Sequence, residues 1–399
     1  MYKTQVAIIG AGPVGCVAAY YLAQHGISVV LTEVGPDCAQ DLRASTFHPP
    51  TLEMLDTLGI TDELIEKGLK APKYHWRERK TGEVFEFDLS EISDATRFPF
   101  RVQCEQFHLA RMLAEKLEKT PHAEVLFNHR MLHYVEHDDK VEISLETPYA
   151  VEKVEAEYLI GADGAGSIVR KLLGVEFDGF TYPEKFLCLT TEEPLEDHLP
   201  NLSLVNYVSD PDEWLVLLRV PSLWRVLVPA EEDTPDAELL SDAKKESVFG
   251  GLIGKPDVKT HHRTIYRVHQ RVAKSFRKGR VAIIGDAAHL NNPLGGFGMN
   301  SGIHDAFNLC PKLVSILKKG GDAEALLSKF DHERQTQTHD FVQEQTKLNM
   351  AYMREGDGGE HGLRKEAMQK LIDDPEARRK FLLRQSMIES VRSSQLEAA

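Results

Sequence analysis

The first 33 residues decide the fold, and they begin Met1-Tyr-Lys-Thr-Gln-Val-Ala-Ile-Ile-Gly10-Ala-Gly12-Pro-Val-Gly15-Cys. Residues 6–9 predict a short buried strand, the three glycines a tight turn, and residues 14–25 a helix that Gly26 ends. A second strand over residues 28–31 follows, and Glu33 comes directly after it. This β-α-β unit has the dinucleotide-binding fingerprint, with a pyrophosphate at the helix N-terminus and a carboxylate on the adenosine ribose. The residues expected to contact the dinucleotide are Gly10, Gly12, Pro13, Val14, Gly15 and Glu33.

Two further strand-turn-helix signals lie downstream. The first reads Tyr158-Leu-Ile-Gly-Ala-Asp163-Gly164-Ala-Gly-Ser-Ile-Val-Arg170. The second reads Gly279-Arg-Val-Ala-Ile-Ile-Gly-Asp286-Ala-Ala-His289-Leu-Asn-Asn-Pro293-Leu-Gly295-Gly296-Phe-Gly298-Met299-Asn300-Ser301, and a helix follows for which Asn300 and Ser301 are the predicted N-caps. The positive end of that helix points back into the glycine-rich loop, where it would stabilise an anion.

Composition narrows the class of protein. The chain has 399 residues, enough for more than one core, and its 47 basic and 62 acidic residues give a net charge of -15, which argues against a nucleic-acid partner. We expect no secretory leader at the N-terminus, because no basic segment or apolar signal core precedes the first strand, and no apolar stretch approaches the roughly 18 residues that span a bilayer. Five scattered cysteines predict no disulfide framework. We therefore expect a soluble cytoplasmic protein without a membrane or nucleic-acid partner.

The pattern of hydrophobicity changes between the motifs. Residues 203–229 alternate apolar and polar side chains, as half-buried antiparallel strands do. The expected fold class is α/β with an α+β insert: a Rossmann-like dinucleotide-binding domain and a second, antiparallel-sheet domain inserted into it. The expected ranges are 1–72, 98–177 and 276–350 for the first domain, 73–97 and 178–275 for the inserted one, and 351–399 for C-terminal helices, the last of which begins at Asp374-Pro375.

The three motifs, in this order, resemble those of the FAD-dependent aromatic hydroxylases, single-component flavoprotein monooxygenases typified by p-hydroxybenzoate hydroxylase. The likeness covers most of residues 1–350. It implies an Asp-Gly motif at Asp163 and Gly164 that touches FAD and the nicotinamide, and a Gly-Asp motif in which Asp286 binds the ribityl and phosphate region. It also implies flavin contacts from Arg43, Gln103, Pro293, Gly295, Gly296, Gly298, Met299 and Asn300.

The resemblance implies a reaction as well. NAD(P)H would bind transiently near the Asp-Gly motif and Arg43, because the sequence has no second dinucleotide fingerprint, and would reduce the bound FAD. Addition of O2 would give a flavin C4a-hydroperoxide beside Pro293, which hydroxylates a small aromatic substrate such as a phenol, a hydroxybenzoate or a hydroxypyridine. Two alternatives stay open: a flavin-dependent oxidoreductase that inserts no oxygen, and an FAD-bound redox sensor. A homodimer is a further open alternative.

Substrate-binding residues are expected on the inserted sheet. The candidates are Tyr207, Trp214, Arg219 and Trp224, with Leu217 and Arg225 beside them. The tryptophans also fit a core role, and the arginines fit a solvated strand. His48 is the candidate catalytic base because histidine titrates near neutral pH, although a capping or packing role fits equally. No metal site is expected, since the pair His133 and His137 lacks a carboxylate or cysteine partner.

Overall fold

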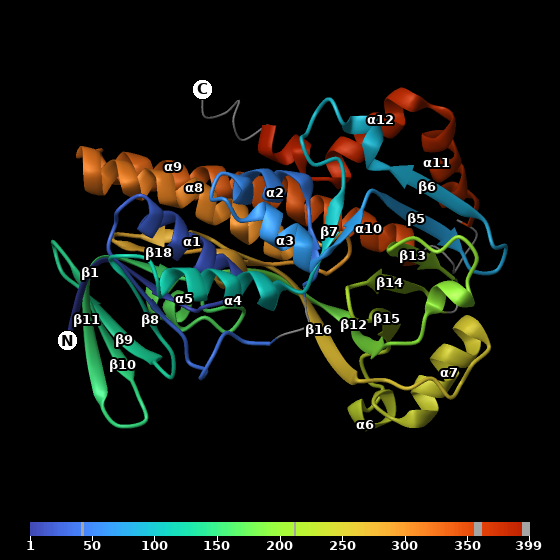
Figure 1. Ribbon diagram of the computed structural model, residues 1–399, viewed down its shortest axis with the longest axis horizontal. Helices are drawn as coiled ribbons and strands as arrows, with labels where there is room; N and C mark the ends of the chain where they lie inside the picture. Colours follow the sequence, from blue (N-terminus) through green and yellow to red (C-terminus); the bar gives the residue numbers. More distant parts are fainter. Residues whose placement is uncertain (41–43, 211–212, 355–360, 393–399) are drawn as a thin grey trace.

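A computed structural model describes residues 1–40, 44–210, 213–354 and 361–392. The molecule is elongated, with one large β-sheet at each end and the helices α8 (Phe297–Lys319) and α9 (Ala323–Gln337) along one long side (Figure 1). Arg43, an expected flavin contact, lies outside the described residues.

The first sheet has the strand order β17-β18-β11-β1-β2-β8. Its core strands β18, β11, β1, β2 and β8 are parallel, and β9 and β10 extend it as an antiparallel ribbon. The bounds are β1 Tyr2–Ile9, β2 Val29–Thr32, β8 Ala123–Leu126, β9 Arg130–Glu136, β10 Val141–Glu146, β11 Val151–Gly161, β17 Arg277–Lys278 and β18 Val281–Ile283. Together with α1 (Pro13–Gln24), α4 (Gln106–Leu117) and α8, this sheet confirms the predicted α/β class.

The register of the parallel strands places the three motifs at one edge. Ile9 at the end of β1 pairs with Thr32 on one side and with Gly161 on the other. Gly161 in turn pairs with Ile283 of β18. The segments that follow these strands therefore meet at the carboxyl edge, where open α/β sheets bind ligands.

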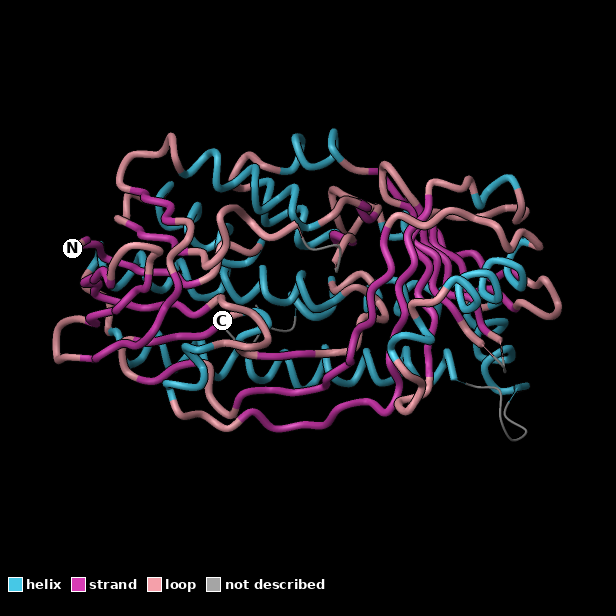
Figure 2. Tube along the Cα trace, turned by 90° about the horizontal axis from the view of Figure 1, so that it is seen from below, coloured by secondary structure: helices cyan, strands magenta, loops and turns pink. Residues whose placement is uncertain are grey.

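The second sheet has the order β19-β16-β12-β15-β14-β13-β5-β6. Its strands are β5 Lys73–Glu78, β6 Val84–Asp88, β12 Phe177–Thr191, β13 Val205–Ser209, β14 Leu215–Arg219, β15 Trp224–Ala230, β16 His262–Ala273 and β19 His289–Leu290. The long strands β12 and β16 run along the molecule between the two ends (Figure 2).

One pairing departs from the expected antiparallel insert. β13 runs parallel to β5, with Asn206 opposite His75. These strands are separated by well over a hundred residues of chain that include β8 to β11 of the first sheet, so no tight hairpin forces them antiparallel. The β5–β6 hairpin therefore forms this edge of the sheet, and its strand β5 is the one that pairs in parallel with β13.

Short elements connect the two sheets. A small sheet consists of β3 (Thr46–Phe47), β7 (Arg101–Gln103) and β4 (Leu69–Ala71). The remaining helices are α2 Pro49–Asp56, α3 Thr61–Lys67, α5 Ile168–Leu173, α6 Asp236–Leu239, α7 Asp242–Ile253, α10 Glu344–Arg354, α11 His361–Asp373 and α12 Pro375–Gln385, with short helical turns η1 Leu89–Ile92, η2 Leu195–Asp197, η3 Gly285–Ala287 and η4 Thr338–Gln343.

The C-terminal helices pack on the second sheet. Met350, Met368 and Leu382 belong to one buried cluster with Trp76 and Phe87 of the β5–β6 hairpin. Asp374 caps α12 by accepting from the backbone N–H groups of residues 376 and 377, which confirms the predicted start of this helix. The last helices therefore cover the end of the molecule that carries β5 and β13 (Figure 1).

The start of α8 differs from the expectation. The helix begins at Phe297, and Gly296, with φ of 72°, is its N-cap. Asn300 and Ser301 lie inside the helix and are buried, so the predicted N-caps are wrong. Asn300 instead donates from Nδ2 to the carbonyl oxygens of Gly296 at 2.7 Å and Thr46 at 2.8 Å. A glycine takes the left-handed cap because it has no Cβ to clash.

Two chain-wide expectations concern membranes and cysteines. Within the described ranges no helix combines the length and the apolar character needed to cross a membrane. All five cysteines are buried and free, which confirms that no disulfide framework holds the fold.

Candidate active site

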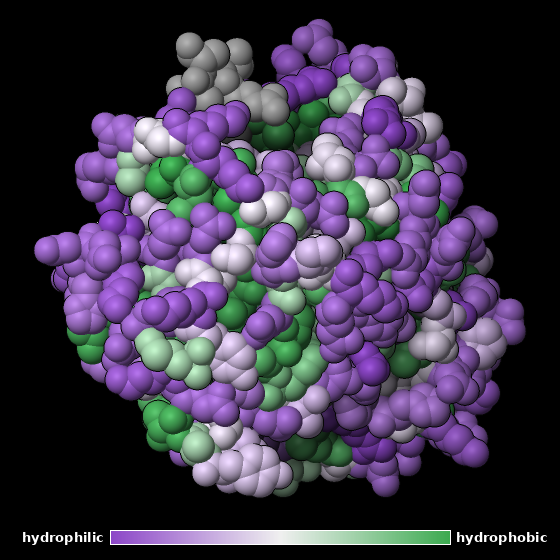
Figure 3. All heavy atoms as spheres, turned by 60° about the vertical axis from the view of Figure 1, so that its left-hand side comes forward, coloured by the Kyte–Doolittle hydropathy of each residue, from purple (hydrophilic) through white to green (hydrophobic). Residues whose placement is uncertain are grey.

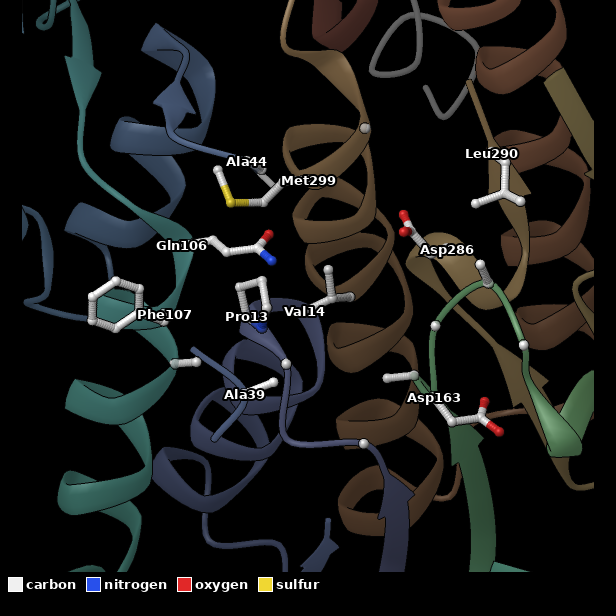
Figure 4. Close-up of a pocket in the computed structure, with 18 of the residues that line it drawn as sticks. Pro13, Val14, Ala39, Ala44, Gln106, Phe107, Asp163, Asp286, Leu290 and Met299 are labelled. Atoms are coloured by element: carbon white, nitrogen blue, oxygen red, sulfur yellow. The ribbon is translucent and has the colours of Figure 1, made fainter. Parts of the chain in front are cut away.

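A single cavity of about 660 Å³ connects the carboxyl edge of the first sheet with one face of the second sheet. Glycine turns and the start of α4 line one end, and eight residues around the glycine-rich loop line the middle: Leu290, Asn291, Pro293, Leu294, Gly296, Phe297, Gly298 and Met299. Strands β13, β14 and β15 form the other end, through Tyr207, Val216, Leu218, Arg225 and Leu227. Figure 4 shows residues from α1, α4 and α8 converging on the first two parts.

The three glycines of the first motif have different surroundings. A Cβ on Gly10 would lie 2.4 Å from the carbonyl oxygen of Ala162, and one on Gly15 would lie 2.0 Å from that of Gly10. A Cβ on Gly12 would meet nothing within 4 Å, and Gly12 lines the cavity. Gly10 and Gly15 therefore allow close packing of turn and helix, while Gly12 leaves the N-terminus of α1 open to a ligand.

Glu33 is held in place at the end of β2. Its Oε2 accepts from the backbone N–H of Ala11 at 2.9 Å, and its Oε1 accepts from that of Gly35 at 3.0 Å. The carboxylate is half-buried and lines the cavity. Each oxygen keeps a lone pair, so the group can accept from ribose hydroxyls without losing its own support.

Asp163 holds the second motif together, and Arg170 connects it to the third. Asp163 accepts from Ser167 and from the backbone N–H of Ile168, and so caps the start of α5. Arg170 donates to the carbonyl oxygens of Ala165 at 2.7 Å and Ala287 at 2.9 Å. Asp163 lines the cavity, but in Figure 4 its carboxylate points away from Pro13 and Val14, whereas that of Asp286 points toward them.

A buried carboxylate holds the turn that presents Asp286. Asp305 accepts from the backbone N–H of Gly285 at 2.9 Å, from His289 Nε2 at 2.7 Å and from Arg334 Nε at 2.6 Å. Burial opposes the charge of Asp305, but His289 and Arg334 outweigh it and lower its pKa to about 2. His289 therefore braces this turn. Asp286 itself is exposed and lines the cavity.

The glycine-rich loop is tied to the β3–α2 segment. Asn300 Oδ1 accepts from the backbone N–H of His48 at 2.9 Å, and His48 Nε2 lies 2.8 Å from the carbonyl oxygen of Gly295. Asn300, Gly295 and His48 do not line the cavity. Pro293, Gly296, Gly298 and Met299 do. The first group thus supports the second from behind.

The burial and the lowered pKa of His48 do not suit a catalytic base. It is fully buried, and burial together with the charge of Arg101 lowers its pKa well below the ordinary value. The imidazole is neutral, and since a carbonyl oxygen only accepts, Nε2 carries the proton and donates it to Gly295. These observations favour the packing role that the sequence left open.

Gln103 lies next to the cavity wall. Its Oε1 accepts from Thr46 Oγ1 at 3.0 Å, and its amide Nε2 is buried without a hydrogen-bond partner. Thr46 lines the cavity. An unpartnered buried donor is costly, and a carbonyl of a bound flavin would satisfy it.

The strand alternation separates the expected substrate residues. In β13 to β15, Tyr207 and Arg225 face the cavity. The opposite face carries Leu217 and Trp224, which pack in a cluster with Phe249 of α7. The Arg219 guanidinium lies 5.8 Å from the Trp224 ring and so belongs to that face as well. Trp214 packs edge-on against Phe186 with ring centres 5.3 Å apart. Trp214, Arg219 and Trp224 thus do not line the cavity. For Arg219 and Trp224 the reason is that neighbouring strand residues point to opposite faces, whereas Trp214 precedes β14 and packs in the cluster of Tyr207 and Val216.

Arg225 is the charged group on the cavity face of the sheet. It is 1% exposed, and its Nη1 donates to Ser45 Oγ at 3.1 Å. Burial lowers the pKa of Arg225, but contacts with Cys188 and Tyr266 outweigh this and raise it overall, so the guanidinium stays charged.

The cavity also includes residues that the sequence did not single out. These are chiefly Ser45, Thr46, Gln106, Phe107, Arg130, Leu218 and Leu227. Gln106 and Phe107 follow a buried strand and begin a helix, which is a signal that sequence reasoning could have used. Arg130 comes from β9 and has no local motif.

One group of potential metal ligands occurs in the described part of the chain. Atoms of Cys104, Glu105 and His108 lie within 4.8 Å of one another. They lie at the N-terminus of α4, where the helix dipole disfavours a cation, and they supply three of the four ligands of a structural zinc site. The cluster therefore gives no reason to add a metal.

The residues present fit FAD. The cavity combines the open helix N-terminus at Gly12, the carboxylate of Glu33 directly after β2, and a glycine-rich loop at the positive end of α8. The unpartnered amide of Gln103 lies beside it, next to Thr46 of the wall. A Rossmann-like sheet with a second sheet closing the flavin end defines the class of flavoprotein hydroxylases.

Comparisons with known proteins agree with this class. Residues 3–345 match the family model described as an FAD binding domain. Para-nitrophenol 4-monooxygenase of Pseudomonas sp. (strain WBC-3) is 32% identical over 383 residues, covering 95% of this chain and 94% of the relative. A 6-hydroxy-3-succinoylpyridine 3-monooxygenase of Pseudomonas putida (strain DSM 28022 / S16) is 32% identical over 353 residues, covering 87% and 88%.

A solved structure is similar over nearly the whole chain. The crystal structure of p-nitrophenol 4-monooxygenase from Pseudomonas putida DLL-E4 has a TM-score of 0.91 and 29% sequence identity, and covers 96% of this chain and 98% of its own. The chain belongs to the FAD-dependent aromatic hydroxylases, the family that its motifs predicted.

Proposed function

We propose that this enzyme uses NAD(P)H and O2 to hydroxylate a small phenol or hydroxypyridine, with FAD bound along the cavity. The continuity of the cavity, from Gly12 to Tyr207, carries the proposal, because it brings a dinucleotide-sized site and an aromatic-lined pocket into one space. The names of two relatives support the substrate type, since one acts on para-nitrophenol and the other on a hydroxypyridine.

The site residues follow from the lining of the cavity. We assign the adenosine and pyrophosphate part of FAD to Gly10, Gly12, Pro13, Val14, Glu33, Asp163 and Gly164, the ribityl and phosphate region to Asp286, and the flavin part to Pro293, Gly296, Gly298 and Met299. We also assign Gln103 to the flavin part, since it bonds to Thr46 of the cavity wall. Four further residues support the cavity lining by packing and hydrogen bonds without lining it themselves: Gly15, Gly295, Asn300 and His48. Tyr207 and Arg225 contact the aromatic substrate.

Reduced FAD supplies the chemistry, because it activates O2 for transfer to an electron-rich ring. The chain's own residues bind and orient the ring and exclude water. Leu218 and Leu227 give the sheet side of the pocket an apolar surface. Asn349 of α10 donates to the carbonyl oxygen of Leu294 at 3.3 Å, so α10 supports the wall near Pro293.

We propose that the domain of the first sheet binds FAD and the domain of the second sheet binds substrate. Residues 1–72, 98–177 and 276–350 would bind FAD, and residues 73–97 and 178–275 would bind substrate. NAD(P)H would act as a transient cosubstrate near Asp163 and Gly164, since the sequence holds a single dinucleotide fingerprint.

A homodimer is a further proposal. The β9–β11 ribbon exposes Leu132, Val135 and Val151. Figure 3 brings this end of the molecule forward and shows apolar groups among a mainly hydrophilic surface. Sedimentation of the wild type beside a Val135→Glu and Val151→Glu double variant tests this surface: a monomeric wild type would contradict it.

The substrate proposal is tested by a screen of phenols, hydroxybenzoates and pyridinols with NADH and with NADPH. We expect a phenol or pyridinol to accelerate NAD(P)H oxidation with little hydrogen peroxide released. Acceleration that yields only hydrogen peroxide, or none with any compound, would contradict it.

A further inference from the structure

Pro293 lies inside a tight turn that the side chain of Asn292 closes. Asn292 Oδ1 accepts from the backbone N–H of Leu294 at 3.1 Å, so this hydrogen bond spans Pro293. The carbonyl oxygen of Pro293 accepts from the N–H of Gly296 at 3.0 Å. Pro293 and Leu294 line the cavity, whereas Asn292 is 0% exposed and does not line it. Asn292 therefore holds this part of the wall from behind.

The nitrogen atoms of Asn292 connect the turn to three other elements. Its Nδ2 donates to the carbonyl oxygen of Thr346 on α10 at 3.0 Å and to Tyr182 Oη on β12 at 3.3 Å. Its backbone N–H donates to Gln270 Oε1 on β16 at 3.1 Å. The position of the turn thus depends on α10 and on the long strands of the second sheet.

The same network requires an amide at position 292. Oδ1 has to accept from a backbone N–H, and Nδ2 has to donate to a backbone carbonyl, which fixes the orientation of the Asn292 amide. A carboxylate could not donate, and an aliphatic side chain could do neither. Gln270 Nε2 donates in turn to Thr346 Oγ1 at 2.9 Å. A buried polar network whose members are all paired favours a single geometry.

Helix α10 also holds the other side of Pro293. Asn349, one turn after Thr346, donates from Nδ2 to the carbonyl oxygen of Leu294 at 3.3 Å. Gln385 of α12 donates to Asn349 Oδ1 at 2.8 Å and so orients that amide. Pro293 therefore lies between two contacts with one helix.

The exact position of this wall matters for a flavin that reacts with oxygen. Transfer to a ring needs near-contact geometry, and a displacement of about 1 Å can cost about a hundredfold in rate. Water has to be excluded as well. Proline has no N–H and a fixed φ, so its neighbours decide where it lies.

We propose that Asn292 is a positioning residue for oxygen transfer, which fixes Pro293 against the reactive edge of the bound flavin and keeps water away from that edge. The proposal rests on the proposed function and adds to it a residue that touches neither cofactor nor substrate. It acts through Pro293 and Leu294, both of which line the cavity.

Two variants separate the roles of the side chain. Asn292→Leu has a similar shape and removes all side-chain hydrogen bonds. Asn292→Ser can still accept from the N–H of Leu294, but its short side chain does not reach Thr346. Asn308→Leu is the matched control, because it removes a half-buried amide on α8 that bonds to Glu333 at 2.9 Å and does not line the cavity.

The first measurement needs no turnover. Acrylamide quenches flavin fluorescence in the oxidised holoenzyme, and the quenching constant reports how open the flavin is to solvent. We expect this constant to rise about twofold or more in Asn292→Leu and less in Asn292→Ser, because the wall is displaced. Asn308→Leu should match wild type. A wild-type constant in both Asn292 variants would overturn the proposal.

The second measurement follows turnover with an accepted substrate. The fraction of NAD(P)H oxidation that yields hydrogen peroxide should rise about threefold or more in Asn292→Leu, while the rate of flavin reduction stays within about twofold of wild type. A residue that only stabilises the fold would lower the urea midpoint and leave quenching and peroxide release unchanged. That result would overturn the proposal.

The outcomes separate this proposal from the proposed function. Stronger quenching in Asn292→Leu supports the position assigned to Pro293 even if wild type hydroxylates no compound, a result that would count against the proposed function alone. Hydroxylation by wild type with unchanged quenching and unchanged peroxide release in both variants would overturn the role of Asn292 alone. If Asn292→Leu loses FAD, the comparison of wild type with Asn292→Ser decides.

Discussion

The imidazole of His48 lies 2.8 Å from the carbonyl oxygen of Gly295, and this bond joins the β3–α2 segment to the glycine-rich loop before α8. The same residue donates its backbone N–H to Asn300. A neutral, buried His48 thus braces the glycine-rich loop, and the lowered pKa argues against a role in proton exchange with substrate.

The first prediction concerns His48→Ala. Loss of the bond to Gly295 leaves a buried carbonyl unpaired, so we expect weaker FAD retention, by about 1–3 kcal/mol. The pH dependence of hydroxylation should not change, because His48 does not titrate in the working range. Equilibrium dialysis of FAD and a pH profile of turnover measure the two effects. Loss of one limb of the profile would instead identify His48 as the base.

The second prediction concerns stability against acid. Burial and the Arg334 charge lower the pKa of His304 to about 3, whereas an unfolded histidine titrates near about 6.5. As the pH falls through this interval, the unfolded chain takes up a proton at residue 304 and the folded protein does not. The free energy of unfolding should therefore fall by up to about 1.4 kcal/mol per pH unit from this residue.

His304→Gln tests that assignment. Glutamine can still bond to Thr51, whose Oγ1 lies 2.9 Å from His304 Nε2. Urea unfolding at a series of pH values should show a shallower loss of stability in this variant, while the exposed His261→Gln control should match wild type. An identical slope in His304→Gln and wild type would refute the assignment.

The third prediction concerns the two carboxylates at the ribose and ribityl positions. Glu33→Ala and Asp286→Ala should each weaken FAD retention by about 1–3 kcal/mol, because each leaves a hydroxyl of the cofactor unpaired. Glu238→Ala, on the short helix α6 of the inserted sheet, is the matched control and should retain FAD. Full FAD occupancy in both test variants would argue strongly against the assigned site.

The fourth prediction compares two arginines on opposite faces of one sheet. Arg225 faces the cavity, and Arg219 lies beside Trp224 on the other face. Arg225→Met should raise the dissociation constant of the aromatic ligand about tenfold or more. Arg219→Met should change it little. Fluorescence titration of the flavin measures both, and equal effects would show that the face assignment is wrong.

These residues also show what the sequence could and could not predict. The span from Gly10 to Glu33 is local: strand, turn, helix and carboxylate follow each other at fixed spacing, so the pattern predicts both the fold and a ligand. The face of Arg225 is not local. Arg225 and Trp224 are neighbours in the sequence, and only the pairing of β15 with β12 and β14 decides which one points into the cavity.

The burial of the Arg101 side chain is another feature that the sequence did not indicate. Arg101 begins the short strand β7, and nothing in its neighbours in the sequence indicates that its side chain is buried beside the end of α12. The prediction of Asn300 as a helix N-cap was wrong for a similar reason. Its residue type favours a helix cap, but the glycine at position 296 takes that role, and the Asn300 side chain joins two loops.

Turnover under 18O2 tests the central claim most directly. Purified protein carrying FAD, supplied with NAD(P)H and an accepted phenol or pyridinol, should form a hydroxylated product with one 18O atom per molecule. A product without label would contradict oxygen transfer to the ring and would favour a flavin oxidoreductase on the same fold.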